Sequence, residues 1–87
     1  MSTLTVFGRP GCHLCEEALA VLERLRAEPA LGDVVVEQVD IEADEALLRA
    51  YLERIPVIAL DGTELYDFTV DEADLRVRLG GSGERAR

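Results

Sequence analysis

Apolar positions alternate along this chain between short unbroken runs and helix-spaced stripes. The run LTVF at residues 4–7 is rich in β-forming residues and predicts a short buried strand. The segment GRPG, residues 8–11, then interrupts the run. The next apolar positions recur at intervals of three and four residues, as on one side of a helix; they are Cys15, Ala18, Leu19, Leu22 and Leu25. Pro29 and Gly32 predict the end of that helix.

A second strand and a second helix follow. DVVVEQVD at residues 33–40 predicts a strand, and its run Val34–Val36 indicates burial on both faces, as in parallel sheets. A helix is predicted from about Glu42 to Glu53, with an apolar stripe made by Ala43, Leu47, Leu48, Tyr51 and Leu52. A strand, a helix and a strand in this order predict a right-handed βαβ unit.

The last third of the chain predicts a hairpin and a final helix. IPVIAL at residues 55–60 and ELYDF at 64–68 predict strands joined by Asp61-Gly62, a two-residue turn signal. Asp71 is expected to open the helix, although Thr69-x-x-Glu72 also fits a capping box. The apolar positions of this helix are Leu75, Val77 and Leu79.

The predicted order of elements is β-α-β-α-β-β-α, which belongs to the α/β class. A parallel first pair followed by a hairpin predicts a four-stranded mixed sheet with helices on both faces. GGSGERAR at residues 80–87 is glycine-rich and charged, and predicts a disordered tail. We therefore expect one folded domain over residues 1–79.

The charge of the chain excludes some classes of partner. Its 87 residues carry a net charge of -9, so phosphate backbones and anionic membrane surfaces would repel it. No apolar run is long enough to cross a bilayer, and the first ten residues lack the basic start and apolar stretch of a secretory signal. We expect a cytoplasmic protein, in a compartment that keeps thiols reduced, and a monomer.

The two cysteines of the chain, Cys12 and Cys15, lie where the first strand gives way to the first helix. A helix N-terminus favours negative charge and lowers the pKa of a thiol at Cys12. Arg9 and His13 add positive charge nearby, whereas the two glutamates after Cys15 oppose the thiolate. Cys15 is one turn into the helix, on the same side. This spacing supports attack on a disulfide by Cys12 and resolution by Cys15.

Two other uses of the cysteines remain open at this point. Free cysteines are common core residues, although the segment 8–11 exposes Cys12 on a loop. A structural zinc site needs about four ligands, and the chain offers one cysteine pair and a single histidine. A C-x-x-C beside a βαβ unit favours redox chemistry over both.

Pro56 is unusual because it opens an interior strand, where a proline cannot donate to the ladder. A cis Ile55–Pro56 bond in a tight loop would account for it, as would a trans proline at a strand start.

Two stretches resemble a known family. FGRPGCHLC at residues 7–15 is similar to the glutaredoxin stretch in which an aromatic residue, a small residue and a lysine lead into C-P-Y-C. RIPV at residues 54–57 is similar to the family's T-V-P. The chain thus resembles the glutaredoxins, within the thioredoxin-fold superfamily, over residues 3–79. The resemblance implies that Cys12 is the nucleophile, that Cys15 resolves, and that Pro56 is a cis proline facing them.

The resemblance also implies a substrate-binding site. The backbone of Ile55 would pair with a bound peptide or with glutathione. Arg9 stands in the place of the family's lysine and would offer charge to a glutathione carboxylate and to the Cys12 thiolate. Asp71 matches an acidic residue of the family and would either bind the glutathione amino group or cap the helix. His13 would stabilise the thiolate as a cation or be an ordinary exposed residue.

Two departures from the family affect the glutathione site. His13-Leu14 replaces Pro-Tyr between the cysteines, which removes an aromatic wall. Thr69-Val70 replaces the Gly-Gly that lets the backbone come close to glutathione. Both changes act on glutathione binding rather than on dithiol chemistry.

These observations predict a thiol-disulfide oxidoreductase that reduces protein disulfides or glutathione mixed disulfides. We expect no metal and no tightly bound cofactor, with glutathione as a co-substrate. One alternative is an Fe–S cluster-binding module, in which Cys12 and an external thiol on each of two subunits hold the cluster. Another is a thioredoxin-fold protein-interaction adaptor with no redox activity.

Overall fold

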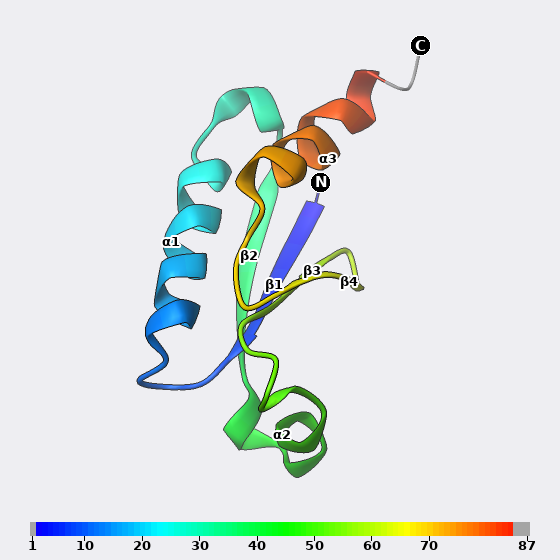
Figure 1. The fold of residues 1–87 in the computed structure, drawn as a ribbon. Helices are drawn as coiled ribbons and strands as arrows, with labels where there is room; N and C mark the ends of the chain where they lie inside the picture. The colour runs from blue at the N-terminus through cyan, green and yellow to red at the C-terminus, as the bar shows by residue number, and fades with distance from the viewer. Residues whose placement is uncertain (1, 85–87) are drawn as a thin grey trace.

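A computed structural model describes residues 2–84 of the chain; residue 1 and residues 85–87 are not described. Helices, strands and two 3-10 turns (η) follow one another in the predicted order (Figure 1). They are β1 (Ser2–Gly8), α1 (His13–Arg26), η1 (Pro29–Leu31), β2 (Val34–Asp40), η2 (Ile41–Ala43), α2 (Glu45–Tyr51), β3 (Val57–Leu60), β4 (Thr63–Asp67) and α3 (Glu72–Glu84).

The four strands form one mixed sheet in the order β2-β1-β3-β4. β1 pairs in parallel with β2 and antiparallel with β3, and β3 pairs antiparallel with β4. The turn between β3 and β4 has a positive φ at both central residues, 49° at Asp61 and 88° at Gly62, as the Asp-Gly signal predicts. The mixed sheet and the α/β class predicted from the sequence are confirmed.

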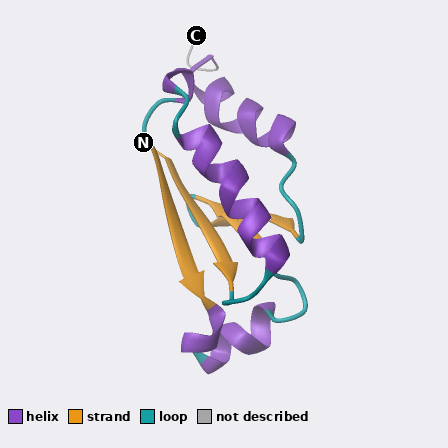
Figure 2. Cartoon of the chain, turned by 90° about the vertical axis from the view of Figure 1, so that its left-hand side faces the viewer, coloured by secondary structure: helices purple, strands orange, loops and turns teal. Residues whose placement is uncertain are grey.

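Helices α1 and α3 lie side by side on one face of the sheet (Figure 2). The core between them and the sheet consists of apolar side chains from all three layers: Leu4, Val6, Ala18, Leu22, Leu25, Val34, Ile58, Leu75 and Leu79. On β1 the side chains alternate in direction, so Phe7 points away from this core. Its ring stacks on Tyr51 of α2, with 4.6 Å between the ring centroids. Helix α2 thus meets the opposite face at one end of the sheet.

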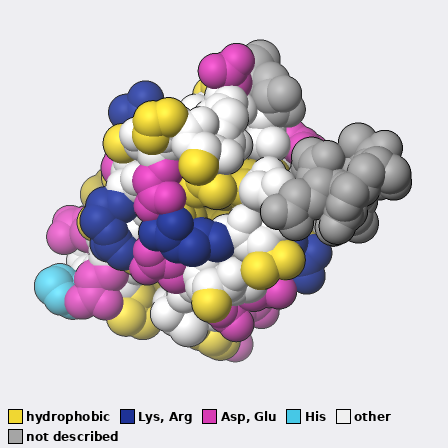
Figure 3. Space-filling model, turned by 90° about the horizontal axis from the view of Figure 1, so that it is seen from above, with side chains coloured by type: hydrophobic (Ala, Val, Ile, Leu, Met, Phe, Trp, Pro, Cys, Tyr) yellow, Lys and Arg dark blue, Asp and Glu magenta, His cyan; other side chains and the backbone are white. Residues whose placement is uncertain are grey.

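Ion pairs join α3 to α1 and to the turn after it. Arg24 lies 2.8 Å from Glu72, and Arg76 binds both carboxylate oxygens of Glu28. Figure 3 shows arginine and acidic side chains lying next to one another on this end of the molecule. Some of the acidic residues therefore pair with arginines and link α3 to α1 and to the turn after it.

Three predictions about burial are wrong. Ala43 and Leu52, two members of the apolar stripe predicted for the second helix, are exposed. Val35 is 39% exposed, because β2 is an edge strand with helices over one face only, so the run Val34–Val36 is not buried on both sides. Val77 is 64% exposed, because residues two apart on a helix point in opposite directions. Leu75 and Leu79, four apart, form the buried stripe of α3 instead.

Two predicted boundaries also differ. The second helix begins at Glu45 rather than near residue 42, because Asp44 accepts hydrogen bonds from the N–H groups of Ala46 and Leu47 and so caps it. The last helix runs to Glu84, into the predicted tail. Gly80 lies beside the Leu31 side chain. The end of the predicted tail, residues 85–87, lies outside the described residues. Within residues 2–84, no helix is long and apolar enough to cross a membrane.

Candidate active site

Cys12 and Cys15 are joined by a disulfide at the N-terminus of α1, with their Cα atoms 5.2 Å apart. Cys12 is the N-cap residue, and its Sγ accepts a hydrogen bond from the backbone N–H of Cys15 at 3.1 Å. The sequence predicted that Cys12 starts the helix and that Cys15 lies one turn in, and the structure confirms both positions. A sulfur in this position lies close to the unpaired N–H groups of the first turn and to the positive end of the helix dipole, and both favour a thiolate.

The two sulfurs differ in their access to solvent. Cys12 is partly exposed, whereas Cys15 is 8% exposed and belongs to the buried side of α1. The last residue of β1, Gly8, lies against Cys15: a Cβ at Gly8 would come within 2.8 Å of the Cys15 Sγ. The sequence marked Gly8 only as the end of a strand, although a small residue precedes the lysine in the family stretch that it resembles. Cys12 is thus the more accessible of the two cysteines.

Both predicted cations near Cys12 are engaged by carboxylates. The Arg9 Nε lies 3.4 Å from a carboxylate oxygen of Glu42, and the His13 Nε2 lies 2.9 Å from one of Glu17. His13 is strongly exposed. The backbone N–H at the helix N-terminus therefore acts directly on the Cys12 sulfur, whereas Arg9 and His13 contact acidic partners.

An open cavity of about 340 Å³ lies behind the disulfide. It is lined by the loop 8–11, by Cys15, Glu16 and Leu19 of α1, and by residues 38–40 of β2. Arg9 and Cys15 both line it. Among the described residues, the other predicted substrate-binding residues do not line it.

Two of those residues, Ile55 and Pro56, directly precede β3. The Ile55–Pro56 bond is cis, so the second of the two forms weighed above, a trans proline, is wrong. Val57, the first residue of β3, pairs with Phe7, which places Pro56 beside the end of β1 and the loop to Cys12. The backbone N–H of Phe68 donates to the Pro56 carbonyl at 2.8 Å. The loop after β4 is thus bound to residues 52–56, the segment before β3 that carries Pro56 (the proline loop).

The Arg54 side chain links the proline loop to β4. Its Nε and Nη2 each lie 3.1 Å from an oxygen of Asp67, and Nη2 lies 2.6 Å from Glu64. The hydrogen bond from Arg54, followed by one from Tyr51, holds the pKa of Glu64 below its usual value. Sequence reasoning passed over Arg54, because nothing local in the chain shows which strand it meets.

Asp71 caps α3: its Oδ1 accepts a hydrogen bond from the N–H of Asp74 at 3.0 Å. The capping alternative is thereby confirmed, and Thr69 is not the cap. Thr69 is exposed and Val70 is half-buried, directly before this cap. Phe68 has a φ of 72° and is 51% exposed, although the sequence predicted it as the last residue of a strand.

The arrangement combines an accessible sulfur at a helix N-terminus, a buried partner sulfur one turn away, and a proline loop alongside. A dithiol in this arrangement can give up two electrons in thiol–disulfide exchange and form the disulfide.

Comparison with known proteins shows the family and supports the fold. The family described as "Glutaredoxin-like domain (DUF836)" matches residues 3–80. The solution NMR structure of protein Ne2328 from Nitrosomonas europaea is similar, with 33% sequence identity and a TM-score of 0.71 over 90% of this chain and 91% of that one. The X-ray structure of target protein XcR50 from X. campestris has 36% identity and a TM-score of 0.68, over 90% and 96% of the two chains.

A mutant thioredoxin from Halobacterium salinarum NRC-1 has 26% identity and a TM-score of 0.63, over 92% of this chain and 73% of that one. None of the curated proteins matches the sequence.

Proposed function

This chain belongs to the glutaredoxin-like family, and we propose that it is a thiol-disulfide oxidoreductase that reduces protein disulfides through Cys12 and Cys15. The observation that carries the proposal is the disulfide itself: a partly exposed Cys12 at the N-terminus of α1, bonded to a buried Cys15. A thioredoxin fold and a cysteine pair able to form a disulfide are consistent with a redox role.

The reaction has two exchange steps. In the reduced protein, the Cys12 thiolate attacks one sulfur of the substrate disulfide; a Cys12–substrate disulfide forms, and the other substrate sulfur leaves as a thiolate and takes up a proton. Cys15 then loses its proton and attacks the Cys12 Sγ, which forms the Cys12–Cys15 bond and releases the second substrate thiol. The substrate gains two electrons, and the protein loses them.

Turnover needs a thiol reductant. Two molecules of a monothiol such as glutathione, or one external dithiol, return both electrons to Cys12 and Cys15. We propose that this occurs in the cytoplasm, where thiols are kept reduced, with the protein acting as a monomer. Arg9 and the backbone of Ile55 are proposed to contact the substrate on the two sides of Cys12.

The test is an equilibrium titration of the protein against mixtures of reduced and oxidised dithiothreitol, with acid quenching, alkylation and mass measurement. We expect one reversible disulfide, with a reduction potential within the range of about -270 to -120 mV that thioredoxin and DsbA span. The Cys15→Ser variant should accumulate a mixed disulfide on Cys12, because the second step is lost. The Cys12→Ser variant should form no such adduct.

Two results would contradict the proposal. One is a wild-type protein whose thiols stay reduced at every mixture. The other is a reversible disulfide in a protein that reduces no disulfide substrate, which would favour the adaptor function.

A further inference from the structure

The backbone at Phe68 is held in a conformation that large side chains avoid. Its φ of 72° lies in the left-handed region, which is common for glycine and asparagine and rare for a bulky residue. The strain is not offset by burial, since the side chain is 51% exposed. A residue with a strained backbone and an exposed aromatic ring is a candidate for binding another molecule.

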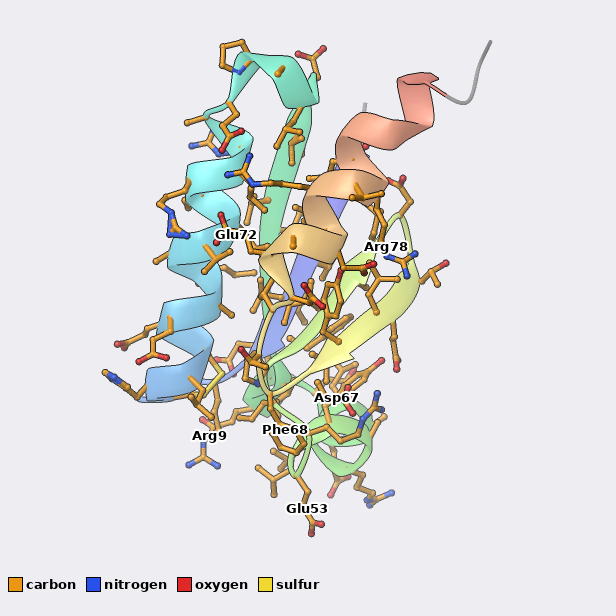
Figure 4. The ribbon with its side chains drawn as sticks, turned by 45° about the horizontal axis from the view of Figure 1, so that its top comes forward. Arg9, Glu53, Asp67, Phe68, Glu72 and Arg78 are labelled. Atoms are coloured by element: carbon orange, nitrogen blue, oxygen red, sulfur yellow. A yellow bond between two sulfur atoms is a disulfide. The ribbon has the colours of Figure 1, made fainter. Side chains whose placement is uncertain are left out.

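Phe68 belongs to the same end of the molecule as the disulfide. Its N–H binds the Pro56 carbonyl, and Pro56 directly precedes the residue that pairs with Phe7 of β1. The next residue of β1, Gly8, lies against Cys15. Figure 4 shows Phe68 and Arg9 at this end, near the N-terminal turn of α1 and its disulfide.

A second exposed apolar side chain lies at the disulfide. Leu14, between the two cysteines, is 47% exposed. Leu14 on α1 and Phe68 on the loop after β4 therefore offer apolar surface on two elements that both adjoin the site.

The charges of the chain disfavour a small anionic substrate. Each arginine within residues 2–84 is paired with a carboxylate; these residues are Arg9, Arg24, Arg26, Arg49, Arg54, Arg76 and Arg78. Glutathione carries two carboxylates and would compete with these acidic partners for the arginine side chains. An uncharged, apolar substrate segment does not compete for these arginines.

We propose that Phe68 is a specificity-determining residue that contacts the substrate, and that the substrate is a protein disulfide with an apolar side chain next to one cysteine. This rests on the proposed oxidoreductase function. The segment lies over the Phe68 ring while its sulfur is attacked by Cys12, and Leu14 covers its other side. The strained backbone keeps the ring turned outward beside Pro56.

The experiment compares two disulfide-bonded model peptides that differ only in the residue next to one cysteine, leucine in one and aspartate in the other. The rate of reduction, as kcat/KM, is measured for the wild type and for Phe68→Asn, which removes the ring but accepts the left-handed backbone. We expect the wild type to prefer the leucine peptide by about tenfold, the scale of one apolar side-chain contact. Phe68→Asn should reduce the preference to about twofold or less.

Two control variants separate this role from a structural one. Phe68→Tyr keeps the ring and should keep the preference. Val77→Ala removes an exposed apolar side chain from α3 and should change neither rate. The urea midpoint of Phe68→Asn should equal or exceed that of the wild type, because the strained conformation is relieved.

The inference is overturned if Phe68→Asn retains the preference for leucine, if it slows both peptides equally, or if it lowers the urea midpoint. It is also overturned if the wild type reduces glutathione disulfide faster than the leucine peptide. If the wild type reduces none of these substrates, the oxidoreductase function itself fails.

Discussion

Gly8 and Cys15 are in direct contact, so that the end of β1 forms a floor beneath the buried sulfur. A Cβ at Gly8 would lie 2.8 Å from the Cys15 Sγ and 3.1 Å from its Cβ. Cys15 is held by the disulfide and by its place in α1, and cannot move aside easily. We expect Gly8→Ala to lower the free energy of unfolding of the oxidised protein by about 1–3 kcal/mol, as overpacking does. Urea unfolding measures this.

Gly80→Ala is the matched control. A Cβ at Gly80 would meet the Leu31 side chain at 3.4 Å, close to an ordinary contact, and alanine favours a helix over glycine by about 0.5–1 kcal/mol. This variant should be as stable as the wild type or more so. An unchanged Gly8→Ala protein would mean that the strand end shifts to make room.

The reduced protein should show unequal thiol reactivity. Cys15 is 8% exposed, whereas Cys12 is partly exposed and lies at the helix N-terminus. We expect iodoacetamide to modify Cys12 at least about tenfold faster than Cys15, because reactivity follows thiolate character and access. Peptide mapping after short reaction times gives both rates. Equal rates would show that α1 opens at its first turn once the disulfide is reduced.

Replacing Arg54 should weaken the attachment of the proline loop to β4. The guanidinium bonds both oxygens of Asp67 and also reaches Glu64. We expect Arg54→Met to lower the urea midpoint at pH 7. The urea midpoint of Arg54→Lys should lie between those of the wild type and Arg54→Met, because lysine keeps the charge and loses the paired hydrogen bonds.

The effect of Arg54 should depend on pH. The pKa of Glu64 is lowered from 4.5, first by its hydrogen bond from Arg54. A carboxylate whose pKa is lower in the folded than in the unfolded protein stabilises the fold at a pH above its unfolded-state pKa. This stabilisation is lost as the pH falls through its folded-state pKa. The difference between wild type and Arg54→Met should therefore shrink below pH 4.5. A difference that stays constant down to about pH 3 would contradict this account.

Tyr66 should make the protein sensitive to alkali. Burial, then a hydrogen bond from its hydroxyl to Asp74, raises the pKa of Tyr66 from 10.0 to about 12. The neutral phenol is favoured in the fold, so its stabilisation is complete below pH 10 and is lost as the pH rises toward 12. The urea midpoint of the wild type should fall more steeply over this interval than that of Tyr66→Phe. Parallel curves for the two proteins would show that the hydroxyl does not contribute.

Much of the fold follows from local patterns in the sequence. The spacing of apolar residues predicted α1 and its buried side, and Asp61-Gly62 predicted the hairpin turn, because each depends on neighbours within a few residues. The position of Cys12 at a helix start follows in the same way from the segment 8–11 before it. The sequence therefore predicted the order of elements, the mixed sheet and the dithiol.

Other features depend on which elements meet in space, and only the tertiary structure decided them. Val35 is exposed because β2 lies at the sheet edge, which the run of valines does not reveal. Gly8 has its role because α1 turns back over the end of β1. Phe68 has its backbone N–H bound to the Pro56 carbonyl, because the two residues lie just beyond the paired ends of β4 and β3. Sequence periodicity records how each segment folds, but contacts between segments fix burial, ion pairs and backbone strain at the site.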